Sequence, residues 1–280
     1  MNTPVQPLRE ASRVRSITDF YLTTMRTAIQ SQFQYRAATY MYLLGMVAEP
    51  VIYLVVWTTI ARSHGGSVNG ISTDQFAAYY IVWTLVRNMN IVFTPYGWEE
   101  RIREGVFSGQ LLRPLHPLHY DIAFFAGSKV MWVLLYLPIA AGLTLVFHPA
   151  FTVSALEIVV FLVAIWGAYL IRTMLLEALG MLTFFTTRGG AVFEAFITVE
   201  LLLSGRLVPL QLMPHWAQTV AAWLPFKWTF YFPIQTLVGN LSAGSLSGGL
   251  GMQLLWIVVG TVGVVLFFRV CVRHYSAVGN

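Results

Sequence analysis

The sequence predicts an all-α integral membrane protein with six transmembrane helices. Of its 280 residues, 57% are hydrophobic and only 10% are charged, and the mean hydropathy is +0.66. A soluble domain of this length carries about a quarter charged residues, so several long segments here cannot face water. The aromatic share of 15% fits the belts of Trp and Tyr at the two membrane interfaces. We attribute the net charge of +5 to basic cytoplasmic loops and expect no nucleic-acid partner.

The polar N-terminal part, residues 1–39, is predicted to be a cytoplasmic arm that carries an interfacial amphipathic helix. It is rich in arginine, and its apolar residues recur at helical spacing. A basic helix with one apolar face lies well in the membrane interface. A cytosolic helix packed on a partner is the alternative. The apolar stripe consists of Ile17, Tyr21, Met25, Ala28 and Phe33. Because no signal-peptide pattern precedes it, we expect insertion to begin with the first span.

Residues 40–280 are predicted to form a single six-span transmembrane domain. A span needs about 20 predominantly apolar residues, and the fourth run is longer, so it must tilt or protrude. We expect a tight turn at 187–190 and a flexible segment at 239–251. The apolar runs place the spans at about 40–61, 75–94, 122–147, 155–186, 191–207 and 252–270.

The Lys and Arg residues of the connecting segments predict that both termini are cytoplasmic. Basic residues accumulate in the cytoplasmic loops of membrane proteins. With the N-terminus inside, the cytoplasmic side holds Arg9, Arg13, Arg15, Arg26, Arg36, Arg101, Arg103, Arg113, Arg188, Arg269 and Arg273. The opposite side holds only Arg62, Arg206 and Lys227.

The motifs of common enzymes and metal sites do not occur in the sequence. It contains no G-x-x-x-x-G-K-[ST] phosphate-binding loop, and no H-E-x-x-H zinc helix or Ser-His-Asp order stands out. His116 and His119 form an H-x-x-H pattern, but Pro117 between them disfavours a helical metal site. The single cysteine, Cys271, excludes an internal disulfide and a cysteine-based metal site. We therefore expect no catalytic residue, no metal and no cofactor bound by this chain.

Ionisable residues within the predicted spans suggest a network of charges inside the membrane. Such residues are costly in lipid, usually face the protein interior and often pair. At about 1.5 Å of rise per residue, three pairs of residues lie at similar depths from the cytoplasmic face and are predicted to meet. They are Glu49 with Arg87, Lys129 with Glu177, and Arg172 with Glu200. The pairs either lock helices together or form a polar coupling path. The predicted network comprises Glu49, Arg87, Lys129, Arg172, Glu177, Glu194 and Glu200.

The cytoplasmic segment 96–116 is the strongest candidate for a docking site. It starts as a charged amphipathic helix with alternating signs, and we expect breaks at Gly109 and Pro114. The alternative is an ordinary solvated loop helix. The residues predicted to contact a partner are Trp98, Glu99, Glu100, Arg101, Ile102, Arg103, Glu104, Gly105, Val106 and Phe107.

The segment 204–226, between the fifth and sixth spans, is too interrupted by proline to cross a membrane and too apolar for a solvent loop. Irregular backbone at membrane depth survives only where protein or a water-filled cavity covers it. We expect one short re-entrant helix after Pro214 and a second from Phe226 to Leu237, with the indoles at headgroup level. The alternative is an amphipathic surface loop. The predicted extracytoplasmic gate consists of Ser204, Gly205, Pro209, Pro214, Trp216, Trp223, Pro225 and Phe226.

Three stretches together resemble the ABC-2 type family of ABC transporter permeases. "IREGVFSGQLLRPLHPL" (102–118) is similar to the cytoplasmic coupling segment of that family. "SGRLVPLQLMPHWAQTVAAWLPF" (204–226) and "FPIQTLVGN" (232–240) are similar to its late segment. The likeness extends over most of the chain and is closest to the branch in which two related permease chains share one ATPase.

The resemblance implies a permease subunit that exports a hydrophobic or amphipathic compound, a lipid or a glycan. It implies a cytosolic ABC ATPase dimer that binds ATP and Mg, a second permease chain in a heterodimer or homodimer, and a bacterial cytoplasmic membrane. Movement of the segment around Glu99 to Phe107 would then drive the spans. A membrane scaffold or assembly protein, or a secondary transporter without an ATPase, is the alternative function.

Overall fold

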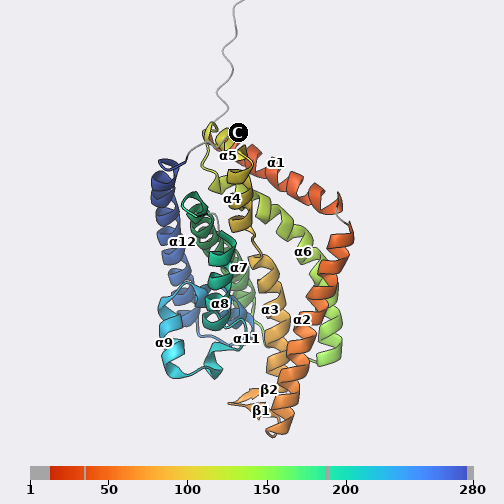
Figure 1. The fold of residues 1–280 in the computed structure, drawn as a ribbon. Coiled ribbons are helices and arrows are strands. Elements are labelled where there is room, and N and C mark those ends of the chain that lie inside the picture. Colours follow the sequence, from red (N-terminus) through yellow and green to blue (C-terminus); the bar gives the residue numbers. More distant parts are fainter. Residues whose placement is uncertain (1–12, 35, 187–188, 276–280) are drawn as a thin grey trace, which may run out of the picture.

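Long helices make up most of the computed structural model, which describes residues 13–34, 36–186 and 189–275 (Figure 1). The predicted turn at 187–190 and the first part of the N-terminal arm lie partly outside these residues. The long helices are α1 (Arg13–Gln34), α2 (Arg36–Ser63), α3 (Thr73–Asn90), α6 (Leu118–Phe147), α7 (Ala155–Met181), α8 (Gly189–Leu203) and α12 (Ala243–Val272). The short ones are α4 (Thr94–Arg103), α5 (Val106–Leu111), α9 (His215–Trp223), α10 (Phe226–Thr229), α11 (Tyr231–Val238) and the 3-10 turns η1 (Leu182–Phe184) and η2 (Leu210–Leu212).

Four of the described helical segments are long and apolar enough to cross a membrane: Met41–Ser63, Leu118–Phe147, Ala155–Phe184 and Ala243–Val272. They correspond to the predicted first, third, fourth and sixth spans. The second and fifth predicted spans fall on α3, which contains Asp74 and Arg87, and on α8, which has 15 residues. At about 1.5 Å per residue, α8 is shorter than a bilayer core of about 30 Å.

Local chemistry explains where the spans begin and end. Ser72 and Gln75 form a capping box that starts α3, and Ser154 and Glu157 form another that starts α7. Helix α3, on which the second predicted span falls, ends at Asn90, because the backbone is extended at Ile91. Helix α8, on which the fifth predicted span falls, ends at Leu203 and is followed by Gly205 at φ 79°.

The segment 239–251, which we expected to be flexible, is helical from Ala243 onward. Its helix, α12, starts where the Ser242 hydroxyl accepts a hydrogen bond from the backbone N–H of Ser245, at 3.2 Å. Glycine inside this helix has a packing role, since a side chain at Gly249 would overlap the ring of Phe232. Close helix contact therefore compensates for the poor helix propensity of glycine.

A two-stranded hairpin, β1 (Ser67–Val68) with β2 (Ile71–Ser72), interrupts the otherwise helical fold between α2 and α3. Its turn is Asn69-Gly70, and both residues have positive φ, at 47° and 81°. An Asn-Gly pair is the strongest short hairpin signal, and the sequence analysis overlooked it.

Helix α7 is the most deeply buried of the four candidate spans. It packs against α12, α4, α11 and α3. Aromatic stacking joins α2 to α3, where Tyr53 lies on Tyr80 and Trp57 on Phe76, with ring centroids 5.2 and 5.0 Å apart. The remaining faces of α2, α6 and α12 expose large apolar side chains, as expected for helices in contact with lipid.

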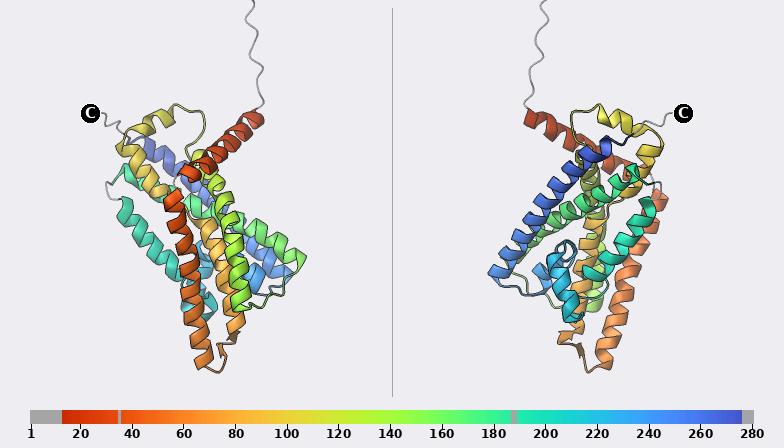
Figure 2. Two further views of the ribbon diagram at one scale, coloured as in Figure 1. Left: turned by 90° about the vertical axis from the view of Figure 1, so that its right-hand side faces the viewer. Right: turned by 60° about the vertical axis from the view of Figure 1, so that its left-hand side comes forward.

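The two ends of the bundle carry different elements. Figures 1 and 2 show α1, α4 and α5 at one end, and the hairpin and α9 at the other. Helix α1 crosses α6 so closely that a side chain at Gly127 would meet the backbone of Met25. Of the predicted apolar stripe of α1, Ala28 is buried, while Ile17 and Phe33 are exposed.

Candidate functional site

The segment of α4 and α5 protrudes at the same end of the bundle as α1 (Figure 1). Pro95 stands in the first turn of α4, where its missing N–H costs nothing. The two helices meet at Gly105, which has φ 70°. The predicted break at Gly109 is wrong, because Gly109 lies inside α5 and the left-handed residue comes earlier.

The inner side of this segment is anchored in the bundle by Trp98 and Phe107, both fully buried. The indole Nε1 of Trp98 donates to Oε2 of Glu177 on α7, at 2.9 Å. The two rings join an aromatic cluster with Phe184 and Phe268. Trp98 also fits over Gly180 of α7, where an added Cβ would overlap the indole. A hydrogen bond and close packing therefore join α4 to α7.

Arg101 faces the bundle as well. Its Nη2 lies 2.8 Å from Oδ2 of Asp121 on α6, and its guanidinium lies over the Trp98 ring, 5.0 Å from the centroid. Arg101 was predicted to contact a partner, but in the structure its guanidinium forms an ion pair that fastens α4 to α6.

The outer side of the segment is mixed in charge and apolar character. Leu112, just after α5, is 88% exposed, and the sequence analysis missed it. It belongs to the stretch "LLRPL" already singled out, so its exposure beside a charged helix was a usable signal. We call this exposed set the outer face; it consists of Glu100, Arg103, Glu104, Val106, Leu112 and Arg113. Of the remaining predicted docking residues, Glu99 and Ile102 are half-buried.

Glu49 of α2 and Arg87 of α3 form an ion pair, as their matched depths predicted, with Oε2 and Nη2 2.7 Å apart. Pro50 follows Glu49 inside the helix. The pair is not enclosed, since the two side chains remain 29% and 20% exposed. Charges at the level of a span belong in a protein interior or beside water rather than in lipid.

Arg172 of α7 and Glu200 of α8 form the second predicted pair, and this one is buried. Nε and Nη2 of Arg172 donate to the two carboxylate oxygens at 2.8 and 2.9 Å, a bidentate geometry. The third nitrogen, Nη1, donates to the backbone carbonyl of Asn90. Arg206, beyond the end of α8, lies 3.8 Å from the same carboxylate. Helices α3, α7 and α8 thus meet at one arginine.

The predicted pairing of Lys129 with Glu177 is wrong. Lys129 donates to the backbone carbonyl of Ile91, while Glu177 accepts from Trp98. Matching depth fixes the height of a residue along its helix but leaves open the direction in which its side chain points. Glu194, the last residue of the predicted network, is exposed and accepts a hydrogen bond from the hydroxyl of Tyr96, at 2.9 Å.

The segment 204–226 begins with a bend that is held from α3. The hydroxyl of Tyr79 donates to the carbonyl of Gly205 at 2.7 Å, and the hydroxyl of buried Ser204 accepts from the N–H of Arg206. Pro209 then precedes the turn η2. The end of α8 is thereby tied to α3.

Helix α9 starts directly after Pro214, as predicted. Its Trp216 and Trp223 are 69% and 77% exposed and share a face, whereas Ala217 and Ala221 are buried. This is the pattern of a short helix that presents indoles to an interface. The helix predicted from Phe226 to Leu237 is two short helices, α10 and α11, because the backbone leaves helical geometry at Phe230. Pro225 immediately precedes α10.

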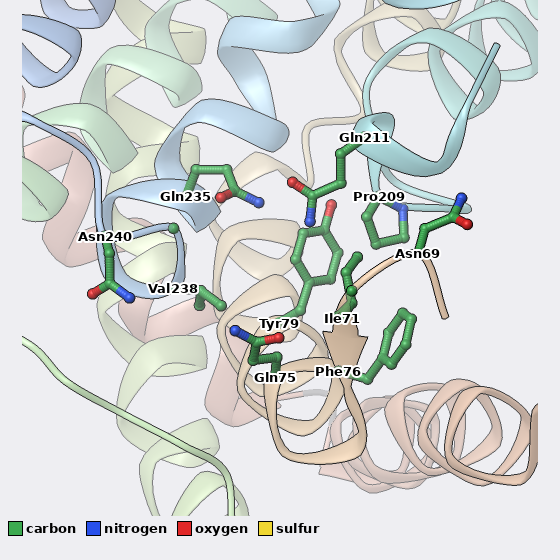
Figure 3. A pocket seen from close by; sticks show the side chains of 12 residues that line it. Asn69, Ile71, Gln75, Phe76, Tyr79, Pro209, Gln211, Gln235, Val238 and Asn240 are labelled. Carbon is green, nitrogen blue, oxygen red and sulfur yellow. The ribbon is translucent and has the colours of Figure 1, made fainter. Parts of the chain in front are cut away.

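A pocket of about 340 Å³ lies beside this segment (Figure 3). Its walls come from the hairpin, the start of α3, the turn η2 and the end of α11, which only the tertiary fold brings together. The sequence analysis did not find it, since its polar residues are uncharged amides scattered over the chain. These amides are Asn69, Gln75, Gln211, Gln235 and Asn240.

The two histidines of the H-x-x-H pattern face different partners. Nδ1 of His119 lies 2.8 Å from the Tyr21 hydroxyl on α1, whereas the His116 ring packs on Phe268. Burial, with a smaller contribution from His119, lowers the pKa of His116 to about 4. Within the described part of the chain, His, Cys, Asp and Glu nowhere gather in groups of three that could hold a metal ion.

Comparison with protein families gives one match. Residues 47–279, from the first span to the C-terminal end, match the family described as "ABC-2 family transporter protein". No curated protein matches the chain.

Proposed function

Because the chain belongs to the ABC-2 family of transporter proteins, we propose that it is the permease subunit of an ATP-driven exporter. A separate ATPase subunit binds ATP and Mg and supplies the energy. The cargo is a hydrophobic or amphipathic compound, a lipid or a glycan that leaves through a bacterial cytoplasmic membrane. The permease has six spans, α3 and α8 included, with both termini in the cytoplasm, which the distribution of Lys and Arg supports.

The observation that carries this proposal is that α4 and α5 have an exposed outer face and an inner side bonded to the membrane helices. Their outer face is exposed and carries both charges and the apolar side chains of Val106 and Leu112, as a docking surface for a soluble protein requires. Their inner side is bonded directly to two spans, through Trp98 to Glu177 and through Arg101 to Asp121. A force applied by the ATPase to the outer face is therefore delivered to α6 and α7.

From α7 the contacts continue toward the opposite end. Arg172 lies about one and a half turns from Glu177 along α7 at 3.6 residues per turn, and it holds Glu200 of α8. Glu200 in turn is close to Arg206 at the start of the segment 204–226. Movement of α7 is thus passed to the residues that we assign to the extracytoplasmic gate. Contacts of this kind support a coupling route and call for a coupling measurement.

A second permease chain completes the translocation path in this proposal. The Glu49–Arg87 pair is partly exposed in the single chain, and lipid is a poor environment for charges. A partner chain or a water-filled path against α2 and α3 removes that cost. The partner is a related chain or a second copy.

Co-purification tests the proposal. The chain is co-expressed with each candidate ABC ATPase subunit of its own organism, extracted in detergent, and captured through a tag on the permease. We expect the ATPase to co-purify with the unchanged chain and to be lost with Arg103→Glu combined with Leu112→Glu. Arg62→Glu, an equivalent charge reversal at the far end of α2, is the matched control and retains the ATPase. A chain that recruits no ATPase in any form contradicts the proposal.

A further inference from the structure

The pocket beside the gate segment has the size and lining of a ligand site. Its volume of about 340 Å³ falls within the range of small-molecule pockets, roughly 300–1,000 Å³. The hairpin, which forms one of its walls, lies at the end of the bundle opposite α4 and α5 (Figures 1 and 2). Five of the pocket's twelve lining residues are amides and none is charged. Its ligand is therefore recognised by hydrogen bonds and apolar contact rather than by an ion pair.

Three of these amides have their oxygen atoms already engaged. Oε1 of Gln75 accepts from the Ser72 N–H at 2.9 Å, within the capping box of α3. Oε1 of Gln211 accepts from the Tyr231 hydroxyl at 3.1 Å. Oδ1 of Asn240 accepts from the Thr152 hydroxyl at 3.0 Å.

The engaged oxygens determine what the amides offer to a ligand. A side-chain amide has one acceptor oxygen and an NH₂ group with two donor hydrogens. Within the described chain, the NH₂ groups of Gln75, Gln211 and Asn240 donate to no protein acceptor. Figure 3 shows the nitrogens of Gln75 and Gln211 directed between the walls of the pocket. The pocket is thus rich in neutral donors.

Gln235 of α11 supplies an independent indication. Its side chain is 6% exposed, yet its amide makes no hydrogen bond to any other described residue. The amide nitrogen is directed into the pocket (Figure 3). Buried polar groups in proteins almost always have a partner, and here the open side is the pocket. Gly239 leaves room for this side chain, because an added Cβ would overlap the Gln235 amide.

The other walls are apolar. Phe76 and Tyr79 of α3 lie behind the wall and are buried, with the Phe76 ring stacked on Trp57 and the Tyr79 hydroxyl directed to the carbonyl of Gly205. Ile71, Pro209 and Val238 complete these walls. Amide donors set among aliphatic side chains suit a molecule that has both hydroxyl oxygens and apolar C–H faces.

We propose that this pocket binds a neutral polyhydroxylated ligand, a sugar. Its hydroxyl and ring oxygens accept hydrogen bonds from Gln75, Gln211, Gln235 and Asn240, while a C–H face of the ring packs on the apolar wall of Ile71, Pro209 and Val238. The lining has no charge to compensate a charged ligand, so the desolvation of such a ligand would be unfavourable. The sugar is either a free glycan or the headgroup of a glycolipid. That it belongs to the exported cargo rests on the proposed function; its binding does not.

Saturation-transfer NMR on the full chain tests this assignment. The protein is purified without sugar-based detergents and placed in nanodiscs of phosphatidylethanolamine and phosphatidylglycerol. The probes are the methyl β-glycosides of glucose, galactose and N-acetylglucosamine, with glucuronate and choline as charged comparisons. We expect transfer to at least one neutral glycoside, and weaker or no transfer to the charged probes.

Variants locate the binding in the pocket. Gln75→Glu keeps the capping-box acceptor but replaces the donor NH₂ with a carboxylate, and Gln211→Glu makes the same change on the opposite wall. Loss of one hydrogen bond is worth roughly a 5–10-fold change in affinity, and we expect at least that from each. Gly239→Ala, which displaces Gln235, has a similar effect. Gln30→Glu, on the exposed face of α1, is the matched control and leaves binding unchanged.

A second set of nanodiscs distinguishes the two sources of the sugar. If added monoglucosyl-diacylglycerol displaces the soluble glycoside, a lipid headgroup reaches the pocket; if it does not, the ligand is a soluble glycan. The assignment is overturned if no neutral glycoside shows transfer, if Gln75→Glu and Gln211→Glu bind as well as Gln30→Glu, or if a charged probe binds best. No ATPase takes part, so this result and that of the co-purification are independent.

Discussion

Nε1 of Trp98 donates a hydrogen bond to Oε2 of Glu177 across 2.9 Å, and both side chains are fully buried. The bond joins a short helix at the surface of the bundle to its most buried span. Each partner is a residue that is costly to bury alone, an indole with a polar nitrogen and a carboxylate. Their meeting explains why a tryptophan stands in a helix that is otherwise charged.

We predict that Trp98→Phe destabilises the protein by about 1–3 kcal/mol, because Glu177 is left buried without its donor. The phenylalanine ring keeps the aromatic cluster, so the change isolates the hydrogen bond. The melting temperature in detergent measures the effect. Trp223→Phe, at an exposed position of α9, is the control with no expected change. Equal melting temperatures for the two variants would show that the hydrogen bond between Trp98 and Glu177 does not contribute to stability.

The two ion pairs within the spans are predicted to differ in importance. Arg172 and Glu200 are 6% and 0% exposed, and Arg172→Met leaves Glu200 buried with only Arg206 at 3.8 Å as a counter-charge, which costs up to about 3–5 kcal/mol. The double variant Arg172→Met with Glu200→Met is less destabilised than the single one. By contrast, Arg87→Met in the exposed pair costs about 0–1 kcal/mol. Denaturation of the four proteins provides the comparison, and a similar loss in both single variants contradicts it.

Helix α1 is predicted to depend on a single glycine of α6. A Cβ at Gly127 would lie 2.5 Å from the carbonyl oxygen of Met25, so Gly127→Ala forces the two helices apart. Overpacking of this kind costs about 1–3 kcal/mol. The readout is trypsin cleavage after the exposed Arg26, which becomes faster when α1 detaches. Gly142→Ala in the same helix is the control, since a Cβ there meets no other atom within 4 Å. Equal cleavage rates in Gly127→Ala and Gly142→Ala would show that α1 does not pack on α6 at Gly127.

Stability is predicted to fall under mildly acidic conditions because of His116. Burial holds its pKa at about 4 in the folded protein, against 6.5 for an unperturbed histidine. The unfolded chain therefore binds a proton that the folded one does not, and stability present above pH 6.5 is lost as the pH falls toward 4. We measure the melting temperature between pH 7.5 and 4.5 and expect its dependence on pH to be weaker in His116→Phe than in the unchanged protein. The control is His64→Gln, at an exposed histidine, in which the melting temperature should depend on pH as in the unchanged protein. The same pH dependence in both variants would refute the assignment to His116.

The sequence determined the class of protein and much of its local structure. Low charge and long apolar runs can be satisfied only in a membrane, whatever the packing. Proline positions predicted the start of α9, and the motif at 102–118 indicated the family that the match over residues 47–279 then established. These features depend on composition or on neighbours along the chain, which is why they can be read without coordinates.

Only the tertiary structure decided which side chains meet. Depth correctly matched Glu49 with Arg87 and Arg172 with Glu200, but it failed for Lys129 because the rotation of a helix about its axis comes from packing. The same packing turned Arg101 inward to Asp121. It also gathered five amides from three separate segments around one pocket. A contact between segments far apart in the chain is a property of their arrangement, and no local pattern encodes it.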